Sequence, residues 1–343
     1  MCVIFVYVNS NPIAGGFKLI LASNRDEFYA RETQAAAKWA NKEHVYGGID
    51  LEPGHEGGTW LAVGGHEGVF KIGALLNLTG EPKPRNAVAI QHNHIMHLNP
   101  NNNKADKIFP TITPPIISAV TSPLLLHNEP FLLGRGMIVS DFVASTDEYN
   151  IQTYNSKLLA DCKKYSAFNF VSIEISDNTP AHVSLLSNKP PRLEHFVENK
   201  CYGFGNSLAS APLQKVIKGR QRFESVVEDF HSKLTTTHKE YISNKSLQME
   251  LVTNLKNLLK CKKKYWPDAE LQRRAPNWGE ELSGLNVCMP QAAYGSRTHT
   301  VILIDEHNKL HFYEETMTGL DPEGEWRQTH IEKKFFENKN ANL

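Results

Sequence analysis

The sequence predicts an α+β fold, a sandwich of two mostly antiparallel sheets flanked by helices. Runs of β-branched and aromatic residues occur toward both ends of the 343-residue chain, and segments of helical periodicity occupy its middle and late parts. This order does not follow the strand–helix alternation of a parallel α/β fold. A hydrophobic content of 41% is enough for a sizeable core.

Four strand pairs carry the prediction of antiparallel sheets. In each pair, turn-forming residues separate two short apolar runs. The pairs are 2–8 with 17–22, 59–63 with 69–76, 166–174 with 181–187, and 300–304 with 310–313.

Helices are predicted where apolar residues recur at a spacing of three or four. A segment opened by Pro212 carries such a stripe to Phe230, and a Leu-rich stripe follows. The predicted helices are 212–230, 246–260, about 146–165 and a shorter one at 87–97. Residues 91–130 lose periodicity and predict an irregular loop inserted in a single domain of residues 1–343.

The composition limits which partners and which cellular compartment the sequence predicts. Lys+Arg 37 balances Asp+Glu 37, so no overall field attracts nucleic acid, and none is predicted as a partner. Five cysteines without Cys-x-x-Cys spacing predict a reducing compartment such as the cytoplasm. The run Lys260-Cys261-Lys262-Lys263-Lys264 is open to two interpretations, transient contact with a membrane surface or a solvated loop.

Cys2 is the first candidate for chemistry. A small second residue allows Met1 to be removed, which would leave a thiol and a free α-amine on one residue. The amine titrates near neutrality, at about 7.7–8.0, so it can accept the thiol proton in N-terminal nucleophile catalysis. The alternative is that Cys2 is a small apolar residue at the start of a strand.

A polar group, Ser23-Asn24-Arg25-Asp26-Glu27, follows the second predicted strand. If the first hairpin closes, Arg25 and Asp26 lie beside Cys2. Arg25 would then favour the thiolate, and Asp26 would hold the α-amine. The alternative is an ordinary ion pair with Arg31 at the end of the strand.

These motifs resemble those of the transport and Golgi organisation protein two family, also called the NRDE family. The resemblance rests on ordered segments across most of the chain. They are Met1-Cys2-Val3-Ile4, Ala22 to Phe28 with Asn24-Arg25-Asp26-Glu27, Thr59-Trp60, Gly134-Arg135-Gly136, Gly205-Asn206-Ser207 and Tyr294 to Thr298.

The resemblance implies an αββα fold like that of N-terminal nucleophile hydrolases. It further implies a location in cytoplasm and mitochondria, and a function in intracellular haem trafficking. Haem would be the transient cargo, passed from haem-rich compartments to haem-acceptor proteins.

The motifs are also similar, more distantly, to those of choloylglycine hydrolases and related penicillin acylases, which cleave amide bonds with an N-terminal cysteine. That similarity implies catalytic positions at Cys2, Arg25 and Asp26. Asn77 and Asn206 resemble the donors that stabilise an oxyanion. Arg222 resembles a further arginine of that site. A turn or strand-cap role is the alternative for each asparagine.

Haem ligands are the least defined prediction. We assign His55, His66 and His299, near the motif segments, together with Asn24, as candidate cargo-binding residues. Weak binding in a hydrophobic crevice with basic groups for the propionates suits a carrier. His92, His94 and His97 admit a ligand interpretation or that of exposed loop residues. No zinc-helix motif occurs, and no metal site is predicted.

Overall fold

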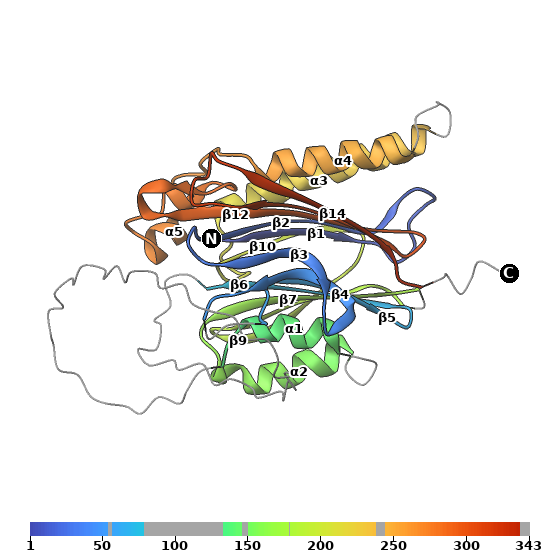
Figure 1. The fold of residues 1–343 in the computed structure, drawn as a ribbon, viewed down its shortest axis with the longest axis horizontal. Helices are drawn as coiled ribbons and strands as arrows, with labels where there is room; N and C mark the ends of the chain where they lie inside the picture. The colour runs from blue at the N-terminus through green and yellow to red at the C-terminus, as the bar shows by residue number, and fades with distance from the viewer. Residues whose placement is uncertain (54–56, 79–132, 146–149, 178, 238–243, 337–343) are drawn as a thin grey trace, which may run out of the picture.

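The structure of the chain is a computed structural model in which four layers stack as helices, sheet, sheet and helices (Figure 1). It describes residues 1–53, 57–78, 133–145, 150–177, 179–237 and 244–336. Within these residues lie two seven-stranded sheets whose paired strands are antiparallel. The predicted α+β sandwich is therefore confirmed.

The first sheet, sheet A, contains the start of the chain and its last strands. Its strand order is β10-β1-β2-β12-β13-β14, with β11 paired to β12. The strands are β1 (Val3–Val8), β2 (Phe17–Phe28), β10 (Cys201–Gly205), β11 (Cys288–Met289), β12 (Tyr294–Asp305), β13 (Lys309–Met317) and β14 (Trp326–Lys334).

The second sheet, sheet B, is formed by the middle of the chain, and its strands follow one another in sequence order. They are β3 (Thr33–Trp39), β4 (Lys42–Asp50), β5 (Leu61–His66), β6 (Val69–Asn77), β7 (Phe168–Ser176), β8 (His182–Asn188) and β9 (Pro191–Phe196).

Helices cover the outer face of each sheet (Figure 1). The helices α1 (Gly136–Ala144) and α2 (Ile151–Asp161) pack on sheet B, and α3 (Gln214–Thr237) and α4 (Asn244–Leu259) pack on sheet A. The shorter segments are α5 (Ala269–Arg274) and the 3-10 turns η1 (Cys162–Lys164), η2 (Glu281–Ser283) and η3 (Pro290–Ala292). No helix in the described part of the chain has the length and apolar character needed to cross a bilayer.

Side-chain alternation along the strands divides the core into layers. On β1, Val3, Phe5 and Tyr7 join the layer between sheet A and its helices, and Ile4 and Val6 join the layer between the sheets. The same alternation on β2 places Ile20 and Ala22 on the helix side, and Leu19 and Leu21 between the sheets. All of these residues are buried.

Most predicted elements occur close to their predicted bounds. The third predicted helix is shorter than expected, because the Asn150 side chain accepts a hydrogen bond from the Thr153 amide and caps α2 at its first turn. The predicted helix at 87–97 and the whole of the predicted loop at 91–130 lie outside the described residues.

Candidate functional site

Cys2 lies directly before β1, on the face between the two sheets. It packs against the inter-sheet core, and its Sγ accepts a hydrogen bond from the Asp26 amide at 3.3 Å. Burial raises the pKa of the Cys2 thiol, and the nearby α-ammonium and Arg25 only partly oppose that rise. Arg25 favours the thiolate as expected, but desolvation has the larger effect on the pKa of the Cys2 thiol.

The α-amine lies on the other side of the strand, toward the helices. The amine of Met1 is 3.0 Å from Asp26 Oδ2 and donates a hydrogen bond to the Tyr294 hydroxyl at 2.6 Å. Ser296 Oγ donates to Asp26 Oδ1 at 2.5 Å. The alternative ion pair with Arg31 does not involve Asp26, because Arg31 binds Asp50 and Glu27 instead.

Lys215, at the start of α3, closes this amine pocket. Its Nζ donates to the Met1 carbonyl at 2.8 Å and to the Gly284 carbonyl at 3.1 Å, and lies 3.9 Å from Asp26 Oδ2. The side chain is fully buried, and this desolvation lowers the pKa of Lys215 while Asp26 opposes the change. The carboxylate thus faces two cations inside the protein.

Three arginines lie near one another's charges on this side of the site: Arg25 beside Cys2, Arg297 near Arg25, and Arg135 near Arg31. Arg25, next to Cys2, stacks on the indole of Trp60 from sheet B at 4.3 Å. Arg297 lies at a β-bulge in β12, where the register to β2 shifts between Ser296 and Thr298. Arg135, just before α1, donates to the Ala167 carbonyl at 2.9 Å.

These three side chains are called the arginine cluster below, and Glu27 stabilises the charge of each from a distance. Burial and the neighbouring Arg25 lower the pKa of Arg297 to about 10, and burial and Arg31 lower the pKa of Arg135. Among the described residues, no carboxylate forms a salt bridge with Arg25, Arg135 or Arg297. Arg25 Nη1 and Arg297 Nε are buried without a hydrogen-bond partner. Such groups are suited to an anionic ligand.

Asn206 is brought next to Cys2 by strand register. Gly205 pairs with Val3, so Asn206 follows at the position beside Cys2. Its Nδ2 donates to the backbone carbonyl of Asn77, and its buried Oδ1 has no hydrogen-bond partner. The two predicted asparagines therefore meet where sheet A approaches sheet B, although the Asn77 side chain itself is exposed.

Arg222 lies away from this site. It is exposed on α3, seven residues after Lys215 and thus about 10 Å further along the helix axis. Its hydrogen bond goes to the Tyr265 hydroxyl at 3.3 Å. The structure therefore does not bring Arg222 together with Cys2.

Asn24 and His299 form a buried hydrogen-bonded pair rather than an open ligand site. Asn24 Nδ2 donates to the carbonyls of Leu259 and Leu285, and its Oδ1 is 2.7 Å from His299 Nδ1. The His299 ring stacks on Trp326, and burial lowers the pKa of His299 to about 4. Both residues are fixed by protein partners, which corrects their assignment to cargo binding.

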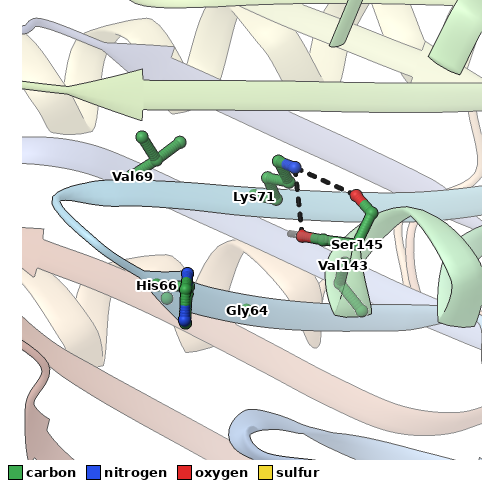
Figure 2. A pocket seen from close by; sticks show the side chains of 7 residues that line it. Gly64, His66, Val69, Lys71, Val143 and Ser145 are labelled. Atoms are coloured by element: carbon green, nitrogen blue, oxygen red, sulfur yellow. Dashed lines mark hydrogen bonds between the residues drawn. The ribbon is translucent and has the colours of Figure 1, made fainter. Parts of the chain in front are cut away.

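His66 lies at the far end of β5, beside a small hollow next to Lys71 and Ser145 (Figure 2). Lys71 Nζ is held there by Ser145 Oγ at 2.9 Å. The hollow measures about 10 Å³, the space of a single water molecule, so it cannot hold a porphyrin. His55 lies outside the described residues, as do the histidines of the predicted loop.

Sequence reasoning named the centre of the site but missed several of its residues. Lys215, Ser296 and Tyr294 complete the amine pocket, and Arg135, Arg297 and Trp60 flank the thiol. Five of these six lie in the motif segments 59–60, 134–136 and 294–298 that carry the resemblance. They are Trp60, Arg135, Tyr294, Ser296 and Arg297. Lys215 carries no such signal, because it resembles any helical lysine.

The basic run after α4 is largely paired. Lys260 binds Glu315, Lys262 binds Glu323 and Lys264 binds Glu281. These contacts support the interpretation of a solvated surface over that of a free cationic patch.

Comparisons with solved structures give a distant neighbour. A mutant of conjugated bile acid hydrolase from Clostridium perfringens aligns over 99% of this chain and 98% of its own, at 8% identity and a TM-score of 0.38. This score is too low to transfer site residues.

Sequence comparisons are closer. The chain is 54% identical over 337 residues to Transport and Golgi organization protein 2 of Drosophila melanogaster, covering 98% of this chain and 99% of the relative. It is 27% and 24% identical to the homologues of Mus musculus and Homo sapiens, covering 94% of this chain and 95% of each relative. The family model described as Transport and Golgi organisation 2 matches residues 1–99 and 120–319, and the chain belongs to that family.

Proposed function

We propose that this protein is an intracellular haem-trafficking factor, which binds haem transiently and passes it from haem-rich compartments to acceptor proteins. The observation that carries the proposal is the arginine cluster of Arg25, Arg135 and Arg297. None of the three forms a direct salt bridge among the described residues, and Arg25 Nη1 and Arg297 Nε are buried without a hydrogen-bond partner. Haem has two propionates, and guanidinium groups bind carboxylates in bidentate geometry.

The surroundings of the cluster suit a reversible carrier. Trp60 offers an aromatic face beside Arg25, and Cys2 offers a soft ligand for iron. Because burial raises the pKa of the Cys2 thiol, little thiolate is present at neutral pH. Ligation by this thiol would be weak, which allows release to an acceptor in the cytoplasm, in mitochondria or at an organelle membrane.

The experiment is a haem titration followed by absorption. We expect Arg297→Gln and Arg135→Gln each to weaken binding by about 10-fold or more, because a charge-assisted hydrogen bond contributes about 1.5–3 kcal/mol. Arg327→Gln is the matched control, since Arg327 is exposed on β14. The dimethyl ester of haem, which lacks free propionates, should bind less tightly than haem. Equal affinities in all of these titrations would contradict the proposal.

A second candidate, an N-terminal cysteine hydrolase acting on amide or thioester bonds, is favoured by the amine pocket. Asp26 and Tyr294 hold the amine of Met1, the residue before Cys2, and removal of Met1 would give Cys2 an amine of its own. The Cys2 sulfur would attack the carbonyl carbon while the amine takes the thiol proton. The Asn206 amide, which lies beside Cys2 and donates to the Asn77 carbonyl in the free protein, would stabilise the oxyanion if it turned toward a bound substrate. The leaving amine or thiol takes the proton back, and water then hydrolyses the acyl-cysteine.

Two measurements separate the candidates. Intact mass shows whether Met1 is retained, in which case Cys2 has no free amine and the hydrolase mechanism fails. An electrophilic thioester analogue should acylate the wild type at Cys2 and leave Cys2→Ala unmodified. A haem carrier should instead keep its haem affinity in Cys2→Ala, or change only the absorption band of bound haem if the thiol is a ligand.

A further inference from the structure

A group of side chains that can bind a metal lies on β13 and β14 of sheet A. None of the residues described around the Cys2 thiol comes from these two strands. His311 on β13 pairs with Glu332 on β14, and Tyr313 pairs with His330. Because side chains alternate along a strand, His311, Glu332 and His330 share one face. This face is the outer one, where Tyr313 packs in the layer beneath the helices.

The three potential ligand atoms lie close to one another. Glu332 Oε1 lies 3.5 Å from His311 Nδ1 and 3.5 Å from His330 Nε2, and all three atoms lie within 4.8 Å of one another. A tetrahedral zinc site with bonds of about 2.0–2.1 Å requires ligand atoms about 3.4 Å apart. The two N···O distances of 3.5 Å are close to this edge.

His311 is held in the orientation that a metal ligand needs. It is 5% exposed, its Nε2 lies 3.3 Å from Asp305 Oδ2, and its Nδ1 is buried without a hydrogen-bond partner. Asp305 is itself fixed, because its Oδ1 accepts the amides of His307 and Lys309. A carboxylate on the second ring nitrogen is the usual support of a metal-bound histidine, since it leaves the other nitrogen's lone pair free for the metal.

The other two ligands are partly ordered and reach solvent. The His330 ring stacks on Tyr313 at 4.2 Å between centroids, which fixes its plane. Glu332 binds Lys309 through Oε2, so Oε1 remains turned toward the histidines. His330 and Glu332 are 45% and 41% exposed, so an ion can enter and a water molecule can complete the coordination.

We propose that His311, His330 and Glu332 form a zinc site, with Nδ1, Nε2 and Oε1 as ligands and a fourth position open to water. Two imidazoles and one carboxylate are a ligand set that Zn²⁺ prefers over Ca²⁺ or Mg²⁺, which favour oxygen ligands. Asp305 is the positioning residue that sets the tautomer of His311.

The test is a Zn²⁺ titration of the untagged full chain, freed of metal and read with a chromophoric chelator as competitor. We expect His330→Ala and Glu332→Gln each to weaken binding at least 10-fold, and Asp305→Asn to weaken it about 10–100-fold. His307→Ala is the matched control, because the His307 side chain is 71% exposed in the same turn and contacts Glu306 rather than the three proposed ligands. It should bind Zn²⁺ as the wild type does.

The absorption spectrum of bound Co²⁺ reports coordination geometry. This spectrum would not change in the variants if the three residues had only a structural role. Co²⁺ bound at this site should show the visible bands of tetrahedral coordination, and His330→Ala should lose them. Unchanged Zn²⁺ affinity in His330→Ala and Glu332→Gln would overturn the proposal. A loss in His307→Ala as large as that in His330→Ala would overturn it too, since it would indicate general binding by surface histidines.

Discussion

Asp26 is the residue on which the charges of the amine pocket depend. Its side chain is fully buried and faces both the Met1 amine and Lys215. In Asp26→Asn these two cations would be left in the protein interior without a counter-charge. We expect a loss of about 3–5 kcal/mol in the free energy of unfolding, measured by urea denaturation.

The matched control for Asp26 is Asp229→Asn. Asp229 pairs with Lys233 on the surface of α3, with 49% of its side chain exposed. Removing an exposed pair should cost about 0–1 kcal/mol. Similar losses in both variants would show that the buried carboxylate does not stabilise the pocket.

His299 gives the stability a pH dependence. Its pKa falls to about 4 in the folded protein, below the 6.5 expected in the unfolded chain. Between these values the unfolded chain binds more protons, so stability falls as pH falls from about 6.5 to 4. The full loss is about 3 kcal/mol. Urea denaturation of His299→Gln at pH 7, 6 and 5 should show a shallower dependence than the wild type, and parallel curves would contradict this assignment.

At the scale of elements, α4 is held by the apolar stripe it places on sheet A. Leu255 is fully buried among residues of α3, α4 and the sheet. Leu255→Ala should lower the free energy of unfolding by about 2–5 kcal/mol, because it removes contacts and leaves a cavity. Asn257→Ala, on the exposed side of the same helix, should change it by about 0.5 kcal/mol or less. Thermal and urea denaturation measure both.

The same element shows why parts of the fold could be predicted from sequence. Its Leu-rich stripe and the apolar run of β1 have a clear period, so their type and approximate bounds follow from the residues. The strands β3 and β9 are half-exposed and carry charged residues, and neither has such a period. They are ordered by pairing with neighbouring strands, which local sequence does not encode.

The candidate site could likewise be predicted from the sequence only in part. Cys2, Arg25 and Asp26 could be placed together because one hairpin joins them. Lys215 and Arg297 reach the site from α3 and from a bulge in β12, and only the packing of distant elements brings them there. Asn24 looked equally functional in sequence, yet its hydrogen bonds hold the end of α4 to the sheet.

At the scale of the whole molecule, the balance of charge governs solubility. The net charge is zero with a pI near 7.3. Because repulsion between molecules is weakest at that point, solubility should be lowest near pH 7.3 and higher at pH 6 and pH 8.5. Precipitation by polyethylene glycol across this range measures it. A solubility that decreases steadily through pH 7.3 would contradict the expectation.

The burial of the α-amine has a practical consequence for handling the protein. Met1 is 3% exposed, and its amine is enclosed by Asp26, Tyr294 and the neighbouring Lys215. A purification tag fused ahead of Met1 would turn this amine into an amide, which removes the positive charge that faces Asp26. Tags therefore belong at the other end of the chain, beyond β14, where a fusion leaves the amine pocket intact.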